Sequence, residues 1–185
     1  HDALPISTVF SVEWQGRKLN FIDCPGSDDF IGGAVSALSV TDTAVIVLNA
    51  QYGVEVGTIN HFRYTEKLSK PVIFVVNQLD QEKADYDNVL AQLKDRYGNK
   101  VVPIQYPVVC GSGFNQVVDV LKMKLYRWKP EGGVPEVLDI PDEEMDKAME
   151  FHQALVEASA ENDESLMEKF FEQGTLTEDE MREGI

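Results

Sequence analysis

Cysteine is scarce in this sequence, and no stretch of it is long and apolar. The two cysteines, Cys24 and Cys110, form no close-spaced pair of the kind that zinc sites use, so we expect reduced thiols and no disulfide framework. No apolar run approaches the roughly 20 residues that a membrane-spanning helix needs. The first thirty residues also lack a basic stretch followed by an apolar one, the pattern of a secretory signal. These absences predict a soluble, cytoplasmic protein without membrane association.

Basic residues are also few. The 185 residues include 16 Lys and Arg against 32 Asp and Glu, which gives a formal net charge of −16 at pH 7. Binding to nucleic acid through bulk charge needs an excess of Lys and Arg to neutralise the phosphates. The composition therefore argues against a sequence-specific DNA-binding protein and leaves basic partners open.

The acidic residues are concentrated in one segment. Residues 1–130 hold 13 basic and 14 acidic side chains, whereas residues 131–185 hold 3 basic and 18 acidic ones, a net charge of −15. A Pro- and Gly-containing break at 129–133 separates the two parts. Beyond it, apolar spacing predicts an amphipathic helix from about Met145 to Ala160, a second helix over 163–171 capped by Gly174, and a third that starts at Thr177. Their acidic faces are either a solvated surface or a docking surface for a basic partner, and the basic stretch over 122–129 is expected to pair with them.

Residues 1–130 alternate between strand and helix patterns. The composition, 43% hydrophobic and 26% charged, is that of a globular protein, and the length suits one domain with an appendage. We expect strands over 8–14, 19–23, 43–50 and 71–78, and helices over 57–68 and 86–97. The runs TAVIVLNA and PVIFVVNQ are nearly continuous in apolar residues, which predicts parallel strands buried on both faces. The alternation predicts a parallel α/β sheet, followed by strands or a strand and helix mixture over 101–109 and 114–126.

The first candidate site follows the strand expected over 19–23, which runs directly into Asp23-Cys24-Pro25-Gly26. Ligands of open α/β sheets lie at the carboxyl ends of the strands. The Asp23 carboxylate is suited to hold Mg²⁺ through water, and the Gly26 amide can approach a terminal phosphate because no Cβ stands in the way. Taken alone, this tetrapeptide is more typical of an ordinary turn than of a ligand site.

The second candidate site is Asn77-Gln78-Leu79-Asp80, at the end of the strand expected over 71–78. Asp80 offers two acceptor oxygens, which match the two donors on the Watson–Crick edge of guanine. Asn77 can serve the base edge while tethering neighbouring loops. Adenine would present its amino group in the wrong pattern to the carboxylate. The two sites together predict binding of GTP or GDP with Mg²⁺.

These motifs make the sequence similar to the translational GTPases, specifically elongation factor G and its close relatives. DCPG resembles the DxPG switch element of that family, NQLD resembles its NKxD guanine motif, and Gln51–Glu55 resembles its QGVE stretch. The segments VVDVLKMKLYRW, FHQALVEASAENDE and LMEKFFEQGTLTEDE resemble the insertion that elongation factor G carries inside its GTPase domain. The resemblance runs from about Ser7 to Ile185 and assigns Asp23, Cys24, Pro25, Gly26, Asn77, Gln78 and Asp80 to the nucleotide.

The resemblance has implications for fold and function. It implies an incomplete P-loop GTPase-type parallel sheet flanked by helices over residues 1–100, and an acidic, α-rich inserted subdomain over residues 101–185. It implies hydrolysis of GTP to GDP on the ribosome, in translocation or in ribosome disassembly. It also implies contact between the acidic insertion and the ribosomal stalk.

Several elements of the family pattern do not occur in these 185 residues. They are the phosphate loop GxxxxGK(S/T), the switch threonine motif and the SA element that closes on guanine. The sequence begins with His1 instead of Met, and its opening HDALPI resembles nothing in the family. We therefore expect a piece of a longer protein that, by itself, binds GTP weakly or not at all.

Two substitutions lie inside the motifs that are present. Ser27 stands where the family has the His that positions the attacking water, and a hydroxyl can hold a water but carries no charge near neutral pH. Gln78 stands where the family has Lys, and its shorter, neutral side chain covers the nucleotide less well. Besides a ribosome-associated GTPase, the sequence therefore allows a nucleotide-gated ribosome-binding factor with little hydrolysis. A third reading, an acidic interaction module with a degenerate GTPase core, requires a full-length protein without a phosphate loop.

Overall fold

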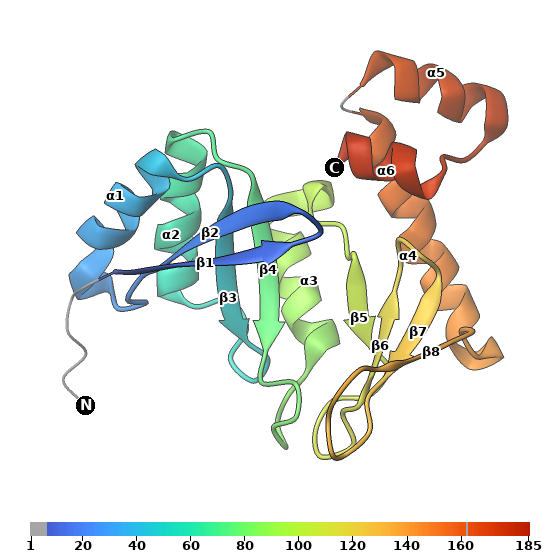
Figure 1. The fold of residues 1–185 in the computed structure, drawn as a ribbon, viewed down its shortest axis with the longest axis horizontal. Coiled ribbons are helices and arrows are strands. Elements are labelled where there is room, and N and C mark those ends of the chain that lie inside the picture. Colours follow the sequence, from blue (N-terminus) through green and yellow to red (C-terminus); the bar gives the residue numbers. More distant parts are fainter. Residues whose placement is uncertain (1–6, 162) are drawn as a thin grey trace. The chain divides into compact units, whose positions relative to one another are not determined.

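The computed structural model describes residues 7–161 and 163–185, so the opening HDALPI lies outside the described part. The chain divides into two compact units, residues 1–77 and 78–185. The first unit contains a β-hairpin followed by helices and a pair of parallel strands. The second contains a helix, a four-stranded sheet and three further helices (Figure 1).

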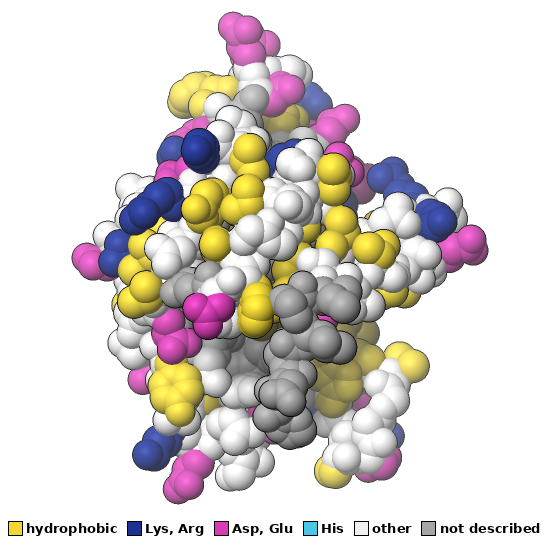
Figure 2. All heavy atoms as spheres, turned by 90° about the vertical axis from the view of Figure 1, so that its left-hand side faces the viewer, with side chains coloured by type: hydrophobic (Ala, Val, Ile, Leu, Met, Phe, Trp, Pro, Cys, Tyr) yellow, Lys and Arg dark blue, Asp and Glu magenta, His cyan; other side chains and the backbone are white. Residues whose placement is uncertain are grey.

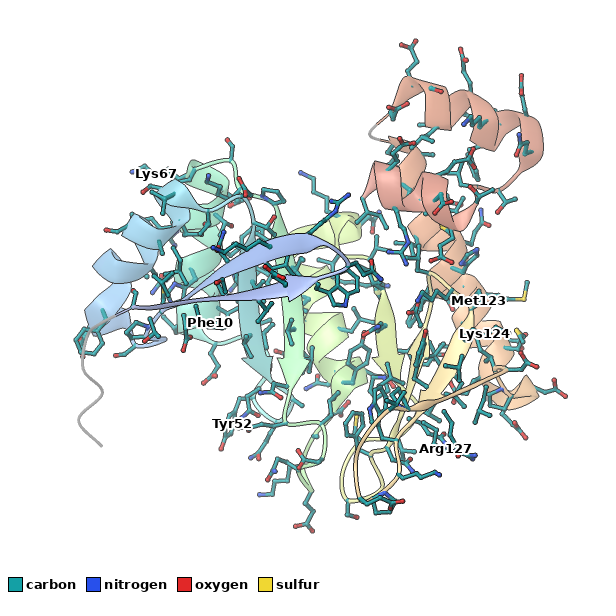
Figure 3. The ribbon with its side chains drawn as sticks, in the orientation of Figure 1. Phe10, Tyr52, Lys67, Met123, Lys124 and Arg127 are labelled. Atoms are coloured by element: carbon teal, nitrogen blue, oxygen red, sulfur yellow. The ribbon has the colours of Figure 1, made fainter. Side chains whose placement is uncertain are left out.

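The first unit opens with an antiparallel hairpin of β1 (Thr8–Trp14) and β2 (Arg17–Asp23). The two turn residues, Gln15-Gly16, have φ values of 48° and 73°, and positive φ at both positions suits the twist of a hairpin. Phe10 pairs with Phe21, and their rings stack with centroids 5.2 Å apart; Figure 3 labels Phe10. The same face carries further exposed apolar side chains, namely Val12, Trp14 and Leu19.

Two parallel strands form the other sheet of the first unit. They are β3 (Ala44–Asn49) and β4 (Val72–Asn77), and α2 (Val56–Lys67) connects them. Phe62 of α2 stacks on Phe74 of β4 with centroids 5.8 Å apart, so α2 packs on one face of this sheet. A further helix, α1 (Ile31–Val40), contacts α2. The predicted strands and the helix over 57–68 are confirmed to within two residues at each end.

The expectation that β3 and β4 are buried on both faces is wrong. Ala44, Ile46 and Leu48 are buried, but Val45 and Val47 are 52% and 61% exposed, and Ile73 and Val75 of β4 are exposed on the same face. Figure 2, which views the molecule from the α1 side, shows further hydrophobic side chains at the surface. An apolar run shows that both faces of a strand are suited to burial. Whether both faces are buried depends on which other elements pack against them. The described part of the first unit provides helices for one face.

The first helix of the second unit is α3 (Tyr86–Tyr97), which starts where the Asp85 carboxylate accepts a hydrogen bond of 2.9 Å from the Asn88 amide. A short 3₁₀ turn, η2 (Gly98–Lys100), follows. The sheet then runs in the order β5, β6, β7, β8, with every neighbour antiparallel. Its strands are β5 (Gln105–Pro107), β6 (Gln116–Asp119), β7 (Lys124–Arg127) and β8 (Glu136–Leu138). Of the two alternatives for 101–126, the structure therefore shows strands and turns without an α-helix.

The main core of the second unit lies between this sheet and the longest helix, α4 (Asp142–Glu161). Tyr106 of β5 is 1% exposed, and its ring meets that of Phe151 edge to face, with centroids 5.4 Å apart. Burial, followed by an interaction with the Glu144 carboxylate, raises the pKa of the Tyr106 phenol above its usual range. The phenol also donates a hydrogen bond of 3.3 Å to the backbone carbonyl of Glu144. This buried contact joins α4 to the sheet.

Two short helices, α5 (Glu164–Gln173) and α6 (Glu178–Gly184), complete the second unit. The Asp163 carboxylate caps α5 by accepting from the amides of the second and third helical residues, and Gly174 ends it with φ of 72°. Thr177 and Glu180 cap the start of α6 reciprocally. The predicted caps at Gly174 and Thr177 are confirmed.

The basic side chains of β7 and the next residues do not pair with the acidic helices as expected. Lys124 binds Asp139 at 2.7 Å and Arg127 binds Glu136 at 2.8 Å, with both cations labelled in Figure 3. Lys129 lies 3.6 Å from the same Glu136. The Arg127 guanidinium is the main cause of a lowered pKa at Glu136. These acids belong to the acidic segment, but they lie on or just after β8, which is the strand beside β7.

Within 7–161 and 163–185, the structure has no helix that is both long enough and apolar enough to cross a membrane.

Candidate functional site

The first candidate motif begins at the last residue of β2. Asp23 is exposed there, and the half-buried Cys24 thiol is held locally. The Cys24 thiol donates to the Ile22 carbonyl at 3.8 Å and accepts from the Ser7 hydroxyl at 3.5 Å. The half-buried Pro25 follows. The structure therefore shows Asp23 at the carboxyl end of its strand, as the sequence predicts.

Gly26 and Ser27 form an exposed loop between β2 and η1 (Asp28–Phe30). The Ser27 carbonyl accepts from the Phe30 amide at 3.0 Å, which closes this turn. A Cβ added to Gly26 would meet no atom within 4 Å, so the space around this residue is open. A Cβ added to Gly57 would lie 3.8 Å from the Gly26 carbonyl oxygen, which places the loop beside the first turn of α2. The amino end of a helix favours negative charge, so this loop is a suitable place for a phosphate.

The second candidate motif begins at the last residue of β4. Asn77 pairs with Asn49 at the carboxyl end of β3, and the Asn77 carbonyl accepts from the Ala50 amide at 2.9 Å. The Asn49 side-chain oxygen accepts from the Gln51 amide at 2.8 Å, which shapes the turn after β3. The structure thus brings Asn77 to the same sheet edge as the Gln51–Glu55 stretch. The sheet does not pair β2 with β3 or β4 among the described residues, so backbone pairing does not join Asp23 to this edge.

The rest of this motif is the first segment of the second unit. Gln78 adopts a left-handed conformation with φ of 60°, and its carbonyl accepts from the Gln81 amide at 3.2 Å. Asp80 is exposed, with the Gln81 side-chain amide 3.5 Å from one carboxylate oxygen. Asp80 is therefore accessible to a base from solvent, as guanine recognition requires.

The residues present suit contact with Mg²⁺ through water better than direct coordination by several side chains. Among the described residues, no three His, Cys, Asp or Glu side chains come together as a set of metal ligands. A single exposed carboxylate such as Asp23 suits a contact through water, because Mg²⁺ keeps several of its own waters in protein sites.

Comparison with known proteins decides the family. The model of the elongation factor Tu GTP binding domain matches residues 6–173 of the 185. The chain belongs to this family. It is 36% identical over 175 residues to an elongation factor G-like protein from Thermotoga maritima, an alignment that covers 95% of this chain and 25% of that protein. A crystal structure of a protein from Thermus thermophilus matches with a TM-score of 0.86 and 30% identity, covering 97% of this chain and 27% of that one.

These matches confirm the resemblance to the translational GTPases around elongation factor G, and the mixed α/β fold with a parallel sheet. Membership of the elongation factor Tu GTP binding domain family also implies that guanine nucleotide is the ligand class. The chain spans about a quarter of the length of the relatives that it matches.

Two glycines near the motifs were not singled out by the sequence analysis. Gly57 lies beside Gly26, and the Gly111 amide donates a hydrogen bond of 2.7 Å to the Leu79 carbonyl. Gly111 lies 32 positions from Leu79, so no local pattern indicates the contact. Its one sequence signal is the spacing Gly-Ser-Gly over 111–113, which is typical of a loop.

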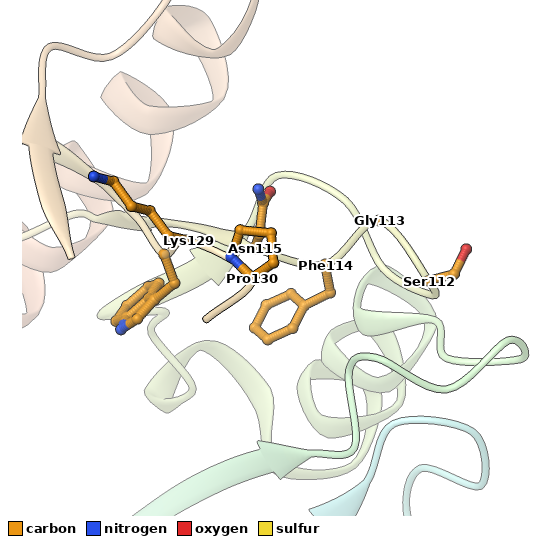
Figure 4. A pocket seen from close by; sticks show the side chains of 7 residues that line it. Ser112, Gly113, Phe114, Asn115, Lys129 and Pro130 are labelled. Carbon is orange, nitrogen blue, oxygen red and sulfur yellow. The ribbon is translucent and has the colours of Figure 1, made fainter. Parts of the chain in front are cut away.

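A pocket of about 380 Å³ lies in the second unit (Figure 4). Loop 112–115 lines it on one side, and Trp128, Lys129 and Pro130 line it on the other. None of these residues belongs to the motifs predicted to bind nucleotide.

Proposed function

We propose that this chain is part of a GTP-binding translation factor of the elongation factor G type, which hydrolyses GTP to GDP on the ribosome. The observation that carries the proposal is the position of Asn77-Gln78-Leu79-Asp80 at the carboxyl end of a parallel strand, with Asp80 exposed. The DCPG motif at the end of β2 supports it, as does the family membership. Translocation and ribosome disassembly are both compatible with these features.

Each motif residue has a role in this proposal. Asp80 accepts hydrogen bonds from the N1–H and 2-amino groups of guanine, while Asn77 holds the base edge and the loop after β3. Gln78 and the backbone of Cys24 and Pro25 line the nucleotide. The Gly26 amide donates to the γ-phosphate, and Asp23 would hold Mg²⁺ through water. When bound, Mg²⁺ neutralises charge on the phosphates. Loss of the γ-phosphate then frees the loop after β2, which the ribosome senses.

A base-specificity switch tests the assignment of Asp80. Asp80→Asn in the complete protein replaces one acceptor by a donor, so GDP affinity should fall about a hundredfold, the equivalent of two hydrogen bonds to a charged group. Xanthine has a carbonyl where guanine has its 2-amino group, so affinity for XDP should rise instead. Glu82→Gln, in the same exposed loop, is the matched control. Unchanged GDP and XDP binding in the Asp80 variant would contradict the proposal.

A second candidate function is a nucleotide-gated ribosome-binding factor with little hydrolysis. Ser27 favours it, because an exposed hydroxyl stands where the family has a His. Ser27→His in the complete protein should then raise ribosome-stimulated turnover by about a hundredfold, the size of a general acid–base contribution. Ser27→Ala serves as the control for loss of the hydroxyl. High turnover in the wild-type protein would eliminate this second candidate.

We also propose that residues 1–100 belong to the GTPase core and residues 101–185 to its acidic insertion, and that the insertion contacts the ribosomal stalk. Residues 131–185 carry a net charge of −15, and the large apolar side chains exposed among these acids include Met149 on α4 and Phe171 on α5. This combination suits a basic partner with an apolar patch. Work on the ribosome would place the protein in the cytoplasm.

By itself, the 185-residue chain should bind GTP weakly or not at all, because it has no phosphate loop to enclose the β- and γ-phosphates. A calorimetric titration with GTP and Mg²⁺ checks this expectation. Micromolar or tighter affinity would refute it.

A further inference from the structure

We propose that Gly111 is a positioning residue for guanine recognition, acting through the hydrogen bond from its amide to the Leu79 carbonyl. The inference rests on the proposed function, since it takes Asp80 as the residue that reads guanine. It gives the acidic insertion a role at the nucleotide, in addition to any contact with a partner.

The backbone of the loop after β4 forms short-range hydrogen bonds within the loop. Its backbone hydrogen bonds run from Gln81 to Gln78 and from Ala84 to Gln81, and each spans only three residues. Asp80 itself is exposed, and the hydrogen bond recorded for its side chain is a long one, 3.5 Å, from its neighbour Gln81. Such local turns leave the direction of the Asp80 side chain weakly determined.

The hydrogen bond from the Gly111 amide restrains the backbone of this loop from a distant part of the sequence. The Gly111 amide lies 2.7 Å from the Leu79 carbonyl oxygen, a short distance for this type of bond. The Leu79 carbonyl and the Asp80 Cα lie in one rigid peptide plane. Fixing that carbonyl therefore fixes the plane from which the Asp80 side chain extends.

Glycine suits position 111 for a conformational reason. Its φ is +87°, a region that side chains with a Cβ rarely adopt. Its own carbonyl accepts from the Phe114 amide at 2.9 Å, so this conformation is built into the turn over 111–114. Space does not exclude a side chain, because a Cβ would lie 3.8 Å from the Gln81 carbonyl, an ordinary contact. A substitution here should therefore act through the backbone and the hydrogen bond.

The test compares three variants of the complete protein. Gly111→Ala places a Cβ on a residue with positive φ, which strains the backbone. Gly111→Asn should cause less strain, because Asn tolerates left-handed conformations. Gly113→Ala is the matched control, since Gly113 lies in the same loop with no positive φ and with open space around its Cβ position. Affinities for GDP and IDP are measured by displacement of a fluorescent nucleotide, and folding is checked by thermal unfolding.

IDP separates positioning from general stability because inosine lacks the 2-amino group that Asp80 reads. Gly111→Ala should weaken GDP binding about three- to tenfold, the equivalent of one hydrogen bond, and weaken IDP binding less. Gly111→Asn should fall between Gly111→Ala and wild type, and Gly113→Ala should match wild type. Equal GDP affinity in Gly111→Ala and Gly113→Ala would overturn the inference, as would equal losses for GDP and IDP. If the wild-type protein binds no guanine nucleotide, the proposed function itself fails.

Discussion

The carboxylate of Glu180, in the first turn of α6, accepts three hydrogen bonds. It accepts from the Lys169 ammonium at 2.8 Å and from the Thr177 amide and hydroxyl, both at 2.9 Å. These bonds, that of Lys169 first, lower the pKa of Glu180 from 4.5 to about 2. Because the folded pKa is lowered, the ionised form favours the folded state above the unfolded pKa. That contribution is lost as the pH falls from about 4.5 towards 2.

Glu180→Gln is therefore expected to reduce stability at neutral pH and to have less effect in acid. Gln keeps the shape and one acceptor oxygen but not the charge, so the gap between wild type and variant should close between about pH 4.5 and pH 2. Urea unfolding followed by circular dichroism at several pH values measures the gap. Glu172→Gln, at an exposed acid on α5, is the control for the loss of one acidic side chain from this segment. A gap that stays constant from pH 7 to pH 2 would contradict the assigned pKa.

At the scale of elements, α6 packs closely against α4 at a point where each helix has a small residue. Ser159 is fully buried on α4, where its hydroxyl donates to the Leu155 carbonyl at 2.7 Å. Gly184 is buried at the end of α6, and a Cβ there would collide with the backbone carbonyl of Ser159. The close approach of the two helices therefore depends on the missing side chain of Gly184.

Gly184→Ala should separate the ends of α6 and α4 and destabilise the protein by about 1–3 kcal/mol, the usual cost of overpacking. Gly32→Ala, in α1, is the matched control, because it lies in a helix and its Cβ would meet nothing within 4 Å. That change should be neutral or stabilising, since Ala favours helix over Gly. Equal unfolding midpoints for the two variants would show that α6 adjusts without cost.

Much of the element order follows from local pattern, and its failures have physical causes. The spacing of apolar residues indicated α4, and the capping residues Gly174 and Thr177 located the ends of α5 and α6, because these signals act within one or two turns. The strands β5 and β8 have three residues each, too few for alternation to separate them from loops. The motifs at the ends of β2 and β4 were also readable from sequence. The bond between Gly111 and Leu79 was not, because it depends on how distant segments meet.

At the scale of the whole chain, the open face of the β3–β4 sheet is an exposed apolar surface with a defined geometry, besides the apolar face of the hairpin. Val45, Val47, Ile73 and Val75 lie on it, next to the sheet's free edges. Contiguous apolar patches of this kind mark interfaces or promote aggregation. We expect the 185-residue chain to bind hydrophobic dyes and to self-associate at high concentration.

Polar substitution of this face checks that expectation. The double variant Val47→Thr and Val75→Thr keeps β-branched side chains but adds hydroxyls, so dye fluorescence should fall and solubility should rise with little change in unfolding temperature. Ile46→Thr, on the buried face of β3, is the contrasting control and should lower the unfolding temperature by several degrees. Unchanged dye binding in the double variant would show that the fluorescence arises elsewhere.

The uneven charge of the chain also has a kinetic consequence. An excess of 15 negative charges within 55 residues produces a field that attracts a positively charged partner before any side chain touches it. Such attraction acts over roughly 8 Å at physiological ionic strength and speeds arrival more than it prolongs residence. The α4–α6 segment is thus suited to frequent, brief encounters, whose rate should fall steeply with added salt while the dissociation rate changes little.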